Sequence, residues 1–94
     1  MHSILDLKKG EYATIDRISD NKLKLKLMEM GCIPGERIKL TQIAPLGDPI
    51  AIEVQGYKLS LRLSEAGSIK IKKIIPVIIK DKSPTAWRML QIEI

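Results

Sequence analysis

The feature that most constrains the fold is a series of short runs in which every second residue is apolar, separated by turn-forming residues. Such runs are typical of β-strands that bury one face. Five strands are expected, over residues 11–18, 36–43, 50–54, 57–63 and 68–75. An open sheet leaves the edges of its outer strands exposed, and so short a chain has little else with which to cover them. The sequence therefore predicts that these strands close into a small barrel.

Interruptions of the alternation predict where the strands bend and turn. Residues 11–18 keep the period until Ile18, which breaks it, so a bulge or the end of the strand is expected there. The dipeptide Gln55-Gly56 between two well-alternating runs is typical of a tight hairpin turn. Residues 64–67 (Ser-Glu-Ala-Gly) predict one helical turn before the last strand.

Residues 22–30 carry a mixed signal. Their Lys-Leu alternation alone resembles a strand, but three observations favour a helix. Cap-forming residues 19–21 precede the segment, none of its residues is β-branched, and Gly31 follows where a left-handed cap is needed. The apolar positions of this helix would share one face: Leu23, Leu27 and Met30.

Two proline- and glycine-containing segments flank the strand at residues 36–43. Pro34 and Gly35 fit the two central positions of a type II turn, which requires a positive φ at the second. Residues 44–49 (Ala-Pro-Leu-Gly-Asp-Pro) form a loop whose two prolines restrict the backbone strongly. We therefore expect this loop to be ordered.

Composition narrows the class of protein. The chain of 94 residues is long enough for one modest core, which must be aliphatic because Phe is absent. The net charge of +5 suits an acidic protein surface, a nucleic acid or an anionic membrane face. A single cysteine excludes an intrachain disulfide, and no stretch resembles a signal peptide or a transmembrane segment. A cytoplasmic protein is expected, with any membrane role exerted through a partner.

Three motifs, in order, resemble the FeoA family. Residues 27–35 (LMEMGCIPG) are similar to its LLxxGxxPG signature, and residues 44–50 (APLGDPI) resemble its APLGDP loop. A third segment, residues 59–71, resembles the closing part of the family pattern. Together the resemblance covers about three quarters of the chain, from about residue 5 to residue 72.

The resemblance implies a mainly β fold, a small SH3-like barrel over residues 1–75 with a short helix inserted between early strands. It also implies a cytosolic accessory protein of ferrous iron uptake, without enzymatic activity. Its partner would be the ferrous iron transporter FeoB, which carries a cytosolic GTPase domain. No firm cofactor follows, although weak binding of a transition metal such as ferrous iron is compatible with the role.

We expect the helix and the loop to form the surface that docks on this partner. A stiff, partly apolar loop loses little entropy on binding. The candidate partner-binding residues are Leu27, Met28, Pro45, Leu46, Gly47, Asp48, Pro49 and Arg62.

Several of these residues also have a purely structural interpretation. Leu27 fits a core position, and Leu46 is as well explained by the shape of the barrel as by docking. Asp48 can accept hydrogen bonds from backbone N–H groups. Arg62 can pair with an acidic partner or with Glu53 of the neighbouring strand.

Other functions find less support in the residues. Cys32 and Asp48 could contribute to a ferrous site in a metal-responsive domain, but their spacing matches no known ligand pattern, and Cys32 also fits a buried apolar position. Nucleic-acid binding by a small basic barrel usually relies on stacking aromatics, which are scarce here. The single histidine, His2, supports no catalytic arrangement.

Residues 76–94 extend beyond the family pattern. We expect this extension to pack on the barrel, on a second copy of the chain or on the transporter. Residues 77–80 could add a strand, and Ser83-Pro84 is a favourable start for a helix over residues 85–91. Its apolar positions would then share a face: Trp87, Leu90 and Ile94.

Overall fold

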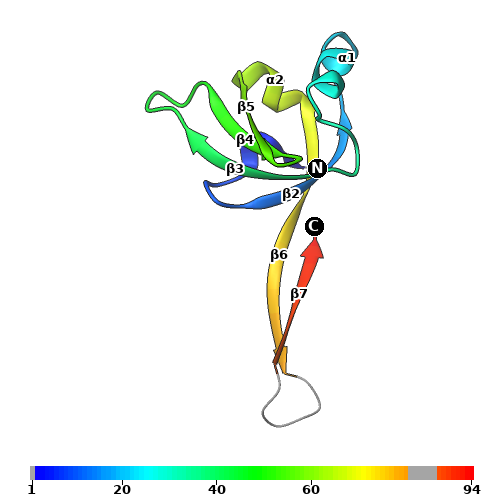
Figure 1. The fold of residues 1–94 in the computed structure, drawn as a ribbon, viewed down its shortest axis with the longest axis vertical. Helices are drawn as coiled ribbons and strands as arrows, with labels where there is room; N and C mark the ends of the chain where they lie inside the picture. Colours follow the sequence, from blue (N-terminus) through cyan, green and yellow to red (C-terminus); the bar gives the residue numbers. More distant parts are fainter. Residues whose placement is uncertain (1, 81–86) are drawn as a thin grey trace.

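One antiparallel sheet dominates the computed structural model, which describes residues 2–80 and 87–94. The order of its strands is β1-β6-β2-β3-β4-β5, and β7 pairs with β6. The strands are β1 (His2–Ser3), β2 (Tyr12–Ile18), β3 (Arg37–Ile43), β4 (Ile50–Val54), β5 (Tyr57–Leu61), β6 (Ile69–Lys80) and β7 (Trp87–Glu93). The sheet curls around the core in Figure 1, and the five predicted strands correspond to β2 through β6. The mainly β fold class is confirmed.

The core is aliphatic, as the composition requires. The inward positions of successive strands are fully buried, including Ile15 on β2, Ile38 on β3 and Ile52 on β4. Each such side chain contributes about 1.5–3 kcal/mol when it is removed from water. The alternation in the sequence therefore sets both the register of the sheet and the position of the core.

Two local irregularities were predicted correctly. The register between β2 and β6 shifts between Ile15 and Arg17, so a bulge precedes Ile18. Gln55 and Gly56, which join β4 to β5, both have positive φ, at 52° and 85°. Two consecutive positive φ values are typical of a type I′ hairpin turn.

The inserted helix, α1 (Asn21–Glu29), confirms the helical interpretation of the Lys-Leu run. Its N-cap is Asp20, whose side chain accepts a hydrogen bond from Lys22 N at 2.8 Å. Gly31 follows the helix with φ 103°. A side chain there would be strained, so glycine ends the helix cleanly.

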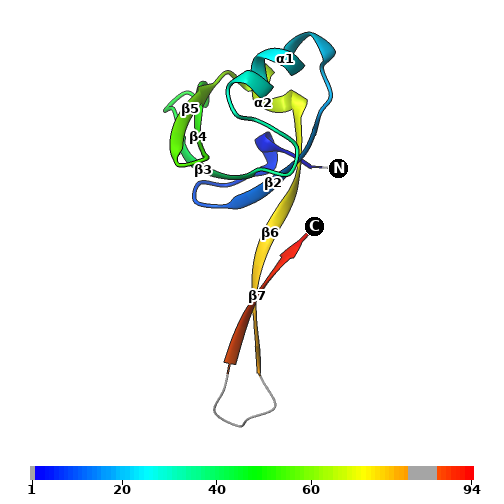
Figure 2. The same cartoon turned by 45° about the vertical axis from the view of Figure 1, so that its right-hand side comes forward.

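Two short helical segments complete the barrel. They are the 3₁₀ helix η1 (Ile4–Asp6) and α2 (Leu63–Ser68). The carboxylate of Glu65 on α2 binds Lys26 Nζ of α1 at 2.9 Å, which ties the two helices together. Helices α1 and α2 lie at one end of the molecule, and strand β7 extends from the opposite end (Figures 1 and 2).

The C-terminal extension forms a long β-hairpin. β6 runs without a break from the barrel to Lys80, and β7 pairs with it from Ile74↔Glu93 to Lys80↔Trp87. Figures 1 and 2 show this ribbon leaving the barrel, and every residue of β7 is exposed.

The helix expected over residues 85–91 was therefore wrong for residues 87–91, while residues 85 and 86 lie outside the described part. Pairing with β6 gives these residues backbone partners that a short isolated helix could not provide. Trp87 and Leu90 consequently lie on opposite faces of a strand instead of sharing a helix face.

Candidate docking site

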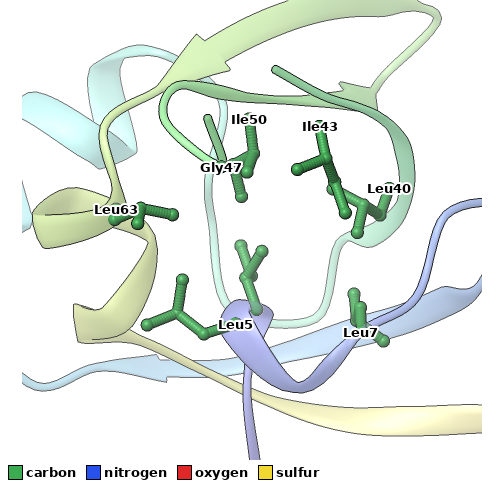
Figure 3. A pocket seen from close by; sticks show the side chains of 8 residues that line it. Leu5, Leu7, Leu40, Ile43, Gly47, Ile50 and Leu63 are labelled. Carbon is green, nitrogen blue, oxygen red and sulfur yellow. The ribbon is translucent and has the colours of Figure 1, made fainter. Parts of the chain in front are cut away.

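An apolar pocket opens beside the proline-rich loop. Its volume is about 320 Å³, and it lies between η1, the end of β3, the loop and the start of α2. Figure 3 shows the side chains that converge on it. The lining residues are Ile4, Leu5, Leu7, Leu40, Ile43, Gly47, Ile50 and Leu63.

The rim of this pocket is unusually exposed for aliphatic side chains. Leu5 is 48% exposed, Ile43 47% and Leu63 37%, while the floor beneath them is buried. The lining contains no charged side chain. A concave, apolar surface of this size suits an apolar side chain of a ligand or of another protein.

The loop over residues 44–49 forms the wall next to the pocket. Gly47 N donates to Ala44 O at 2.7 Å, which closes a β-turn with Pro45 and Leu46 at its centre. Ala44 N also donates to Pro49 O at 3.1 Å, so the loop is closed at its base. Leu46 stands at the tip of this turn and is 97% exposed. The expected order of the loop is thus explained by its own hydrogen bonds.

Asp48 connects this loop to α2. Its Oδ1 accepts a hydrogen bond from Leu63 N at 3.2 Å, and the peptide bond between Asp48 and Pro49 is cis. Leu63 N is one of the first N–H groups of a helix, which have no partner within the helix. The structural interpretation of Asp48, as an acceptor for backbone N–H groups, is therefore confirmed.

The two candidates on α1 differ in exposure. Leu27 is fully buried in the core, so the core interpretation holds and this residue cannot itself contact a partner. Met28 is partly buried and packs against the same core. The exposed part of the candidate surface therefore comes mainly from the loop and from the pocket.

A second, polar hollow of about 340 Å³ lies between α1, the end of β5, α2 and Pro49 of the loop. Lys26, Pro49, Ser60, Arg62 and Glu65 line it. The hydrogen bond from Lys26, followed by that from the backbone N–H of Arg62, lowers the pKa of Glu65. Basic and acidic groups here are arranged around an apolar proline, as at the rim of many interfaces.

Arg62 does not pair with Glu53 as the structural alternative suggested. Glu53 lies opposite Lys58 in the pairing of β4 with β5. Arg62 follows the end of β5 and occupies the N-cap of α2. Its exposed side chain faces the polar hollow beside the loop.

The two residues considered as metal ligands, Cys32 and Asp48, have structural roles in this fold. Cys32 is fully buried, and burial, with a contribution from the negative charge of Glu65, raises the pKa of its thiol to about 11. A protonated, buried thiol is a poor ligand. Within residues 2–80 and 87–94, no group of three or more His, Cys, Asp and Glu side chains is placed to hold a metal ion.

Sequence reasoning found the loop but missed the pocket. Leu5, Ile43 and Leu63 come from three separate segments, and only the fold brings them together. One local signal was available for η1, because Ser3 and Asp6 form a capping box that fixes Leu5 in a helical turn.

Comparison with known proteins decides the family. Residues 2–73 match the FeoA domain family. The chain belongs to the FeoA family. A curated relative from Porphyromonas gingivalis, an Fe(2+) transport protein A/Fe(2+) transporter FeoB fusion protein, is 33% identical over 70 residues. The match covers 73% of this chain but only 8% of that much longer relative.

Solved structures of FeoA proteins share the fold. The FeoA-like protein of Clostridium acetobutylicum has a TM-score of 0.70 at 30% identity, covering 89% of this chain and 94% of that one. Stenotrophomonas maltophilia FeoA, an SH3 domain protein solved with zinc, has a TM-score of 0.67 at 22% identity, covering 76% of this chain and 89% of that one. The SH3-like barrel and the iron-transport family implied by the motifs are confirmed.

One further property of this FeoA chain bears on its relation to the membrane. None of the helices in the described part of the chain is long and apolar enough to span a bilayer.

Proposed function

We propose that this FeoA protein is a cytoplasmic accessory of ferrous iron uptake that docks on the cytosolic, GTPase-containing part of the transporter FeoB. Membership of the FeoA family supports the link to ferrous iron transport. The Porphyromonas gingivalis relative carries both functions in one fusion protein, which supports physical association of the two.

The observation that carries the proposal is the apolar pocket beside the exposed loop. Leu5, Ile43 and Leu63 hold apolar surface open to solvent around a buried floor, and Leu46 is exposed at the tip of the loop whose Gly47 lines the pocket. Burial of these apolar side chains by a partner removes their surface from water, which makes the free energy of binding more favourable. The hydrogen bonds that fix the loop mean that little conformational entropy is lost on docking.

Charge supports the same surface. The chain carries a net charge of +5, and Lys26 and Arg62 lie beside Pro49 at the polar hollow. An acidic patch on the transporter would be attracted to this edge and oriented by it. The apolar pocket would then supply most of the affinity, while Lys26 and Arg62 would orient the partner.

Docking alone regulates nothing unless the two transporter states bind with different affinity. We therefore propose that nucleotide state or pore state of the transporter changes the surface that meets the pocket. This role needs no chemistry from FeoA itself and no resident metal. A metal-responsive FeoA, by analogy with the zinc-bound relative, would have to use ligands other than the buried Cys32.

Calorimetry with the purified cytosolic domain of the cognate transporter tests the proposal. The titration is made with and without guanine nucleotide and with and without a chelator. We expect saturable binding that survives chelation and weakens at least about tenfold in Leu46→Asp, since a charge replaces an apolar contact. Leu25→Asp is the matched control, because Leu25 is a leucine of α1 that is 70% exposed and lines neither the pocket nor the polar hollow.

Two outcomes would contradict the proposal. Leu46→Asp and Ile43→Asp could both bind like the parent protein, which would remove the pocket and loop from the interface. Binding could also disappear on chelation, and the metal-responsive alternative would then replace simple docking.

A further inference from the structure

The C-terminal hairpin has one almost uninterrupted aliphatic face. Ile75 lies opposite Ile92, and Val77 lies opposite Leu90, so these four side chains project from the same side of the ribbon. Two charged residues also lie on this side, Arg88 from β7 and Lys73, which pairs with Ile94, from β6. We call this side the aliphatic face; its apolar members are Ile75, Val77, Ile79, Leu90, Ile92 and Ile94.

Four of these six side chains are exposed to solvent, while Val77 and Ile79 in the middle of β6 are partly exposed. Ile75 is 40% exposed, Leu90 42% and Ile94 54%. The opposite face is more mixed, because Lys80, Gln91 and Glu93 interrupt its apolar side chains. A two-stranded ribbon is marginally stable in water by itself, so a face of this kind requires a cover.

The barrel fixes the ribbon without covering the aliphatic face. Lys73 and Ile94 exchange backbone hydrogen bonds at 2.7 and 2.8 Å, which anchors the end of the chain to β6. Arg37 of β3 donates a hydrogen bond to the side chain of Gln91, on the other side of the ribbon. The hydrogen bond between Arg37 and Gln91 thus fixes the ribbon through its opposite side and leaves the aliphatic face outside this contact.

The free edge of β6 is less suited to a partner strand than the aliphatic face is to a partner. Because Lys73 and Ile94 form a hydrogen-bonded pair, Pro76 and Gln91 form a non-hydrogen-bonded pair three residues further along. The nitrogen of Pro76 thus points to the free edge of β6 and has no hydrogen to donate. Proline at such an edge blocks the addition of another strand.

We propose that the aliphatic face is a self-association surface, covered by the same face of a second copy of this chain. The two ribbons would pack face to face around a two-fold axis, with each face contacting its equivalent. This inference is independent of docking on a transporter, because the ribbon leaves the opposite end of the molecule from α1 and α2 (Figures 1 and 2).

The size of the face fits a weak dimer. Seven residue pairs at about 3.3 Å each make a ribbon roughly 23 Å long. Two such faces bury on the order of 1,000 Å² in total, which is near the lower limit of specific interfaces. The molecule measures 52 Å along its longest axis and 28 Å across, so two ribbons can overlap while the barrels stay apart.

A second copy explains the pattern better than a lipid surface does. The apolar residues continue to the root of the ribbon, where Ile75 and Ile94 lie next to the barrel. A membrane that met the distal end would leave this part uncovered, whereas a second ribbon lying alongside covers all of it. A two-stranded ribbon would also bring unpaired backbone edges into the bilayer, which is costly.

Sedimentation velocity of the full chain, from about 1 µM to about 1 mM, tests the proposal. We expect a monomer–dimer equilibrium in the parent protein and at least a tenfold weaker dimer in Leu90→Lys. Met89→Lys is the matched control, since Met89 is 65% exposed on the opposite face of the same strand. Circular dichroism of both variants confirms that the barrel is folded.

The proposal is overturned by a monomeric parent protein over this whole range. It is equally overturned if Met89→Lys weakens the dimer as much as Leu90→Lys, because the interface would then not be the aliphatic face. Flotation with vesicles of anionic phospholipid tests the other occupant. Vesicle binding by the parent protein that Leu90→Lys abolishes, without a dimer in solution, would assign the face to lipid.

Discussion

Asp48 Oδ1 accepts a hydrogen bond from Leu63 N at 3.2 Å, and this contact joins the proline-rich loop to the first turn of α2. Arg62, at the N-cap of α2, offers no side-chain acceptor to that turn. A residue fifteen positions earlier thus supplies the missing cap and sets the distance between two walls of the apolar pocket.

Asp48→Ala should therefore weaken both stability and docking. We expect the free energy of unfolding to fall by about 1 kcal/mol, because one hydrogen bond and a favourable charge at a helix N-terminus are lost. Binding to the transporter domain should weaken several-fold as the loop loosens. Asp48→Asn keeps an acceptor and should recover most of both effects in urea unfolding and calorimetry. Equal losses in the two variants would show that the hydrogen bond is not the cause.

The ion pair between Lys26 and Glu65 predicts an acid-sensitive link between α1 and α2. Hydrogen bonds lower the pKa of Glu65 in the folded state below its ordinary value of 4.5. The unfolded chain therefore binds more protons, so the contribution is complete above the ordinary pKa and is lost as the pH falls through the folded pKa.

Glu65→Gln should accordingly flatten the pH dependence of stability as the pH falls below the ordinary pKa of 4.5. Urea unfolding at a series of pH values measures this. Glu53→Gln is the control, because Glu53 is exposed on β4 and should leave the slope nearly unchanged. A slope that Glu65→Gln does not alter would contradict the assignment.

Cys32 should be unreactive in the folded protein. Its pKa is raised from 9.0 to about 11, so at pH 8 the thiolate fraction falls on the order of 100-fold, and burial excludes reagents further. Alkylation by iodoacetamide should be at least that much slower in buffer than in urea. Similar rates in both conditions would show that Cys32 is accessible and would reopen its use as a metal ligand.

Gly31 should tolerate a side chain less well than other glycines with positive φ. A Cβ at Gly31 would lie 3.0 Å from Tyr57 Oη, whereas at Gly10 it would meet nothing within 4 Å. Both have φ near 100°, so both alanine variants pay about 1 kcal/mol of backbone strain. Only Gly31→Ala should cost measurably more, and equal midpoints in urea unfolding would contradict this.

Local sequence signals predicted most of the barrel. The alternating runs placed the strands, and the break at Ile18 predicted the bulge, because each depends on nearby residues only. The helix α1 was predicted over a competing strand pattern through its caps, Asp20 and Gly31.

Long-range relationships could not be read in the same way. The pocket needs Leu5, Ile43 and Leu63 from three elements, and no short window contains them together. The extension was expected to be partly helical because its start had favourable capping residues, but β6 provides a pairing partner that outweighs this local preference.

The most direct test of the proposed docking is a two-dimensional NMR titration of the isotope-labelled chain with the cytosolic domain of its cognate transporter. We expect the backbone signals of four residues to shift first and furthest, namely Leu5, Ile43, Leu46 and Leu63, while those of the hairpin strand β7 stay in place. Shifts confined to other surfaces, or none at saturating concentrations of the transporter domain in any nucleotide state, would contradict it.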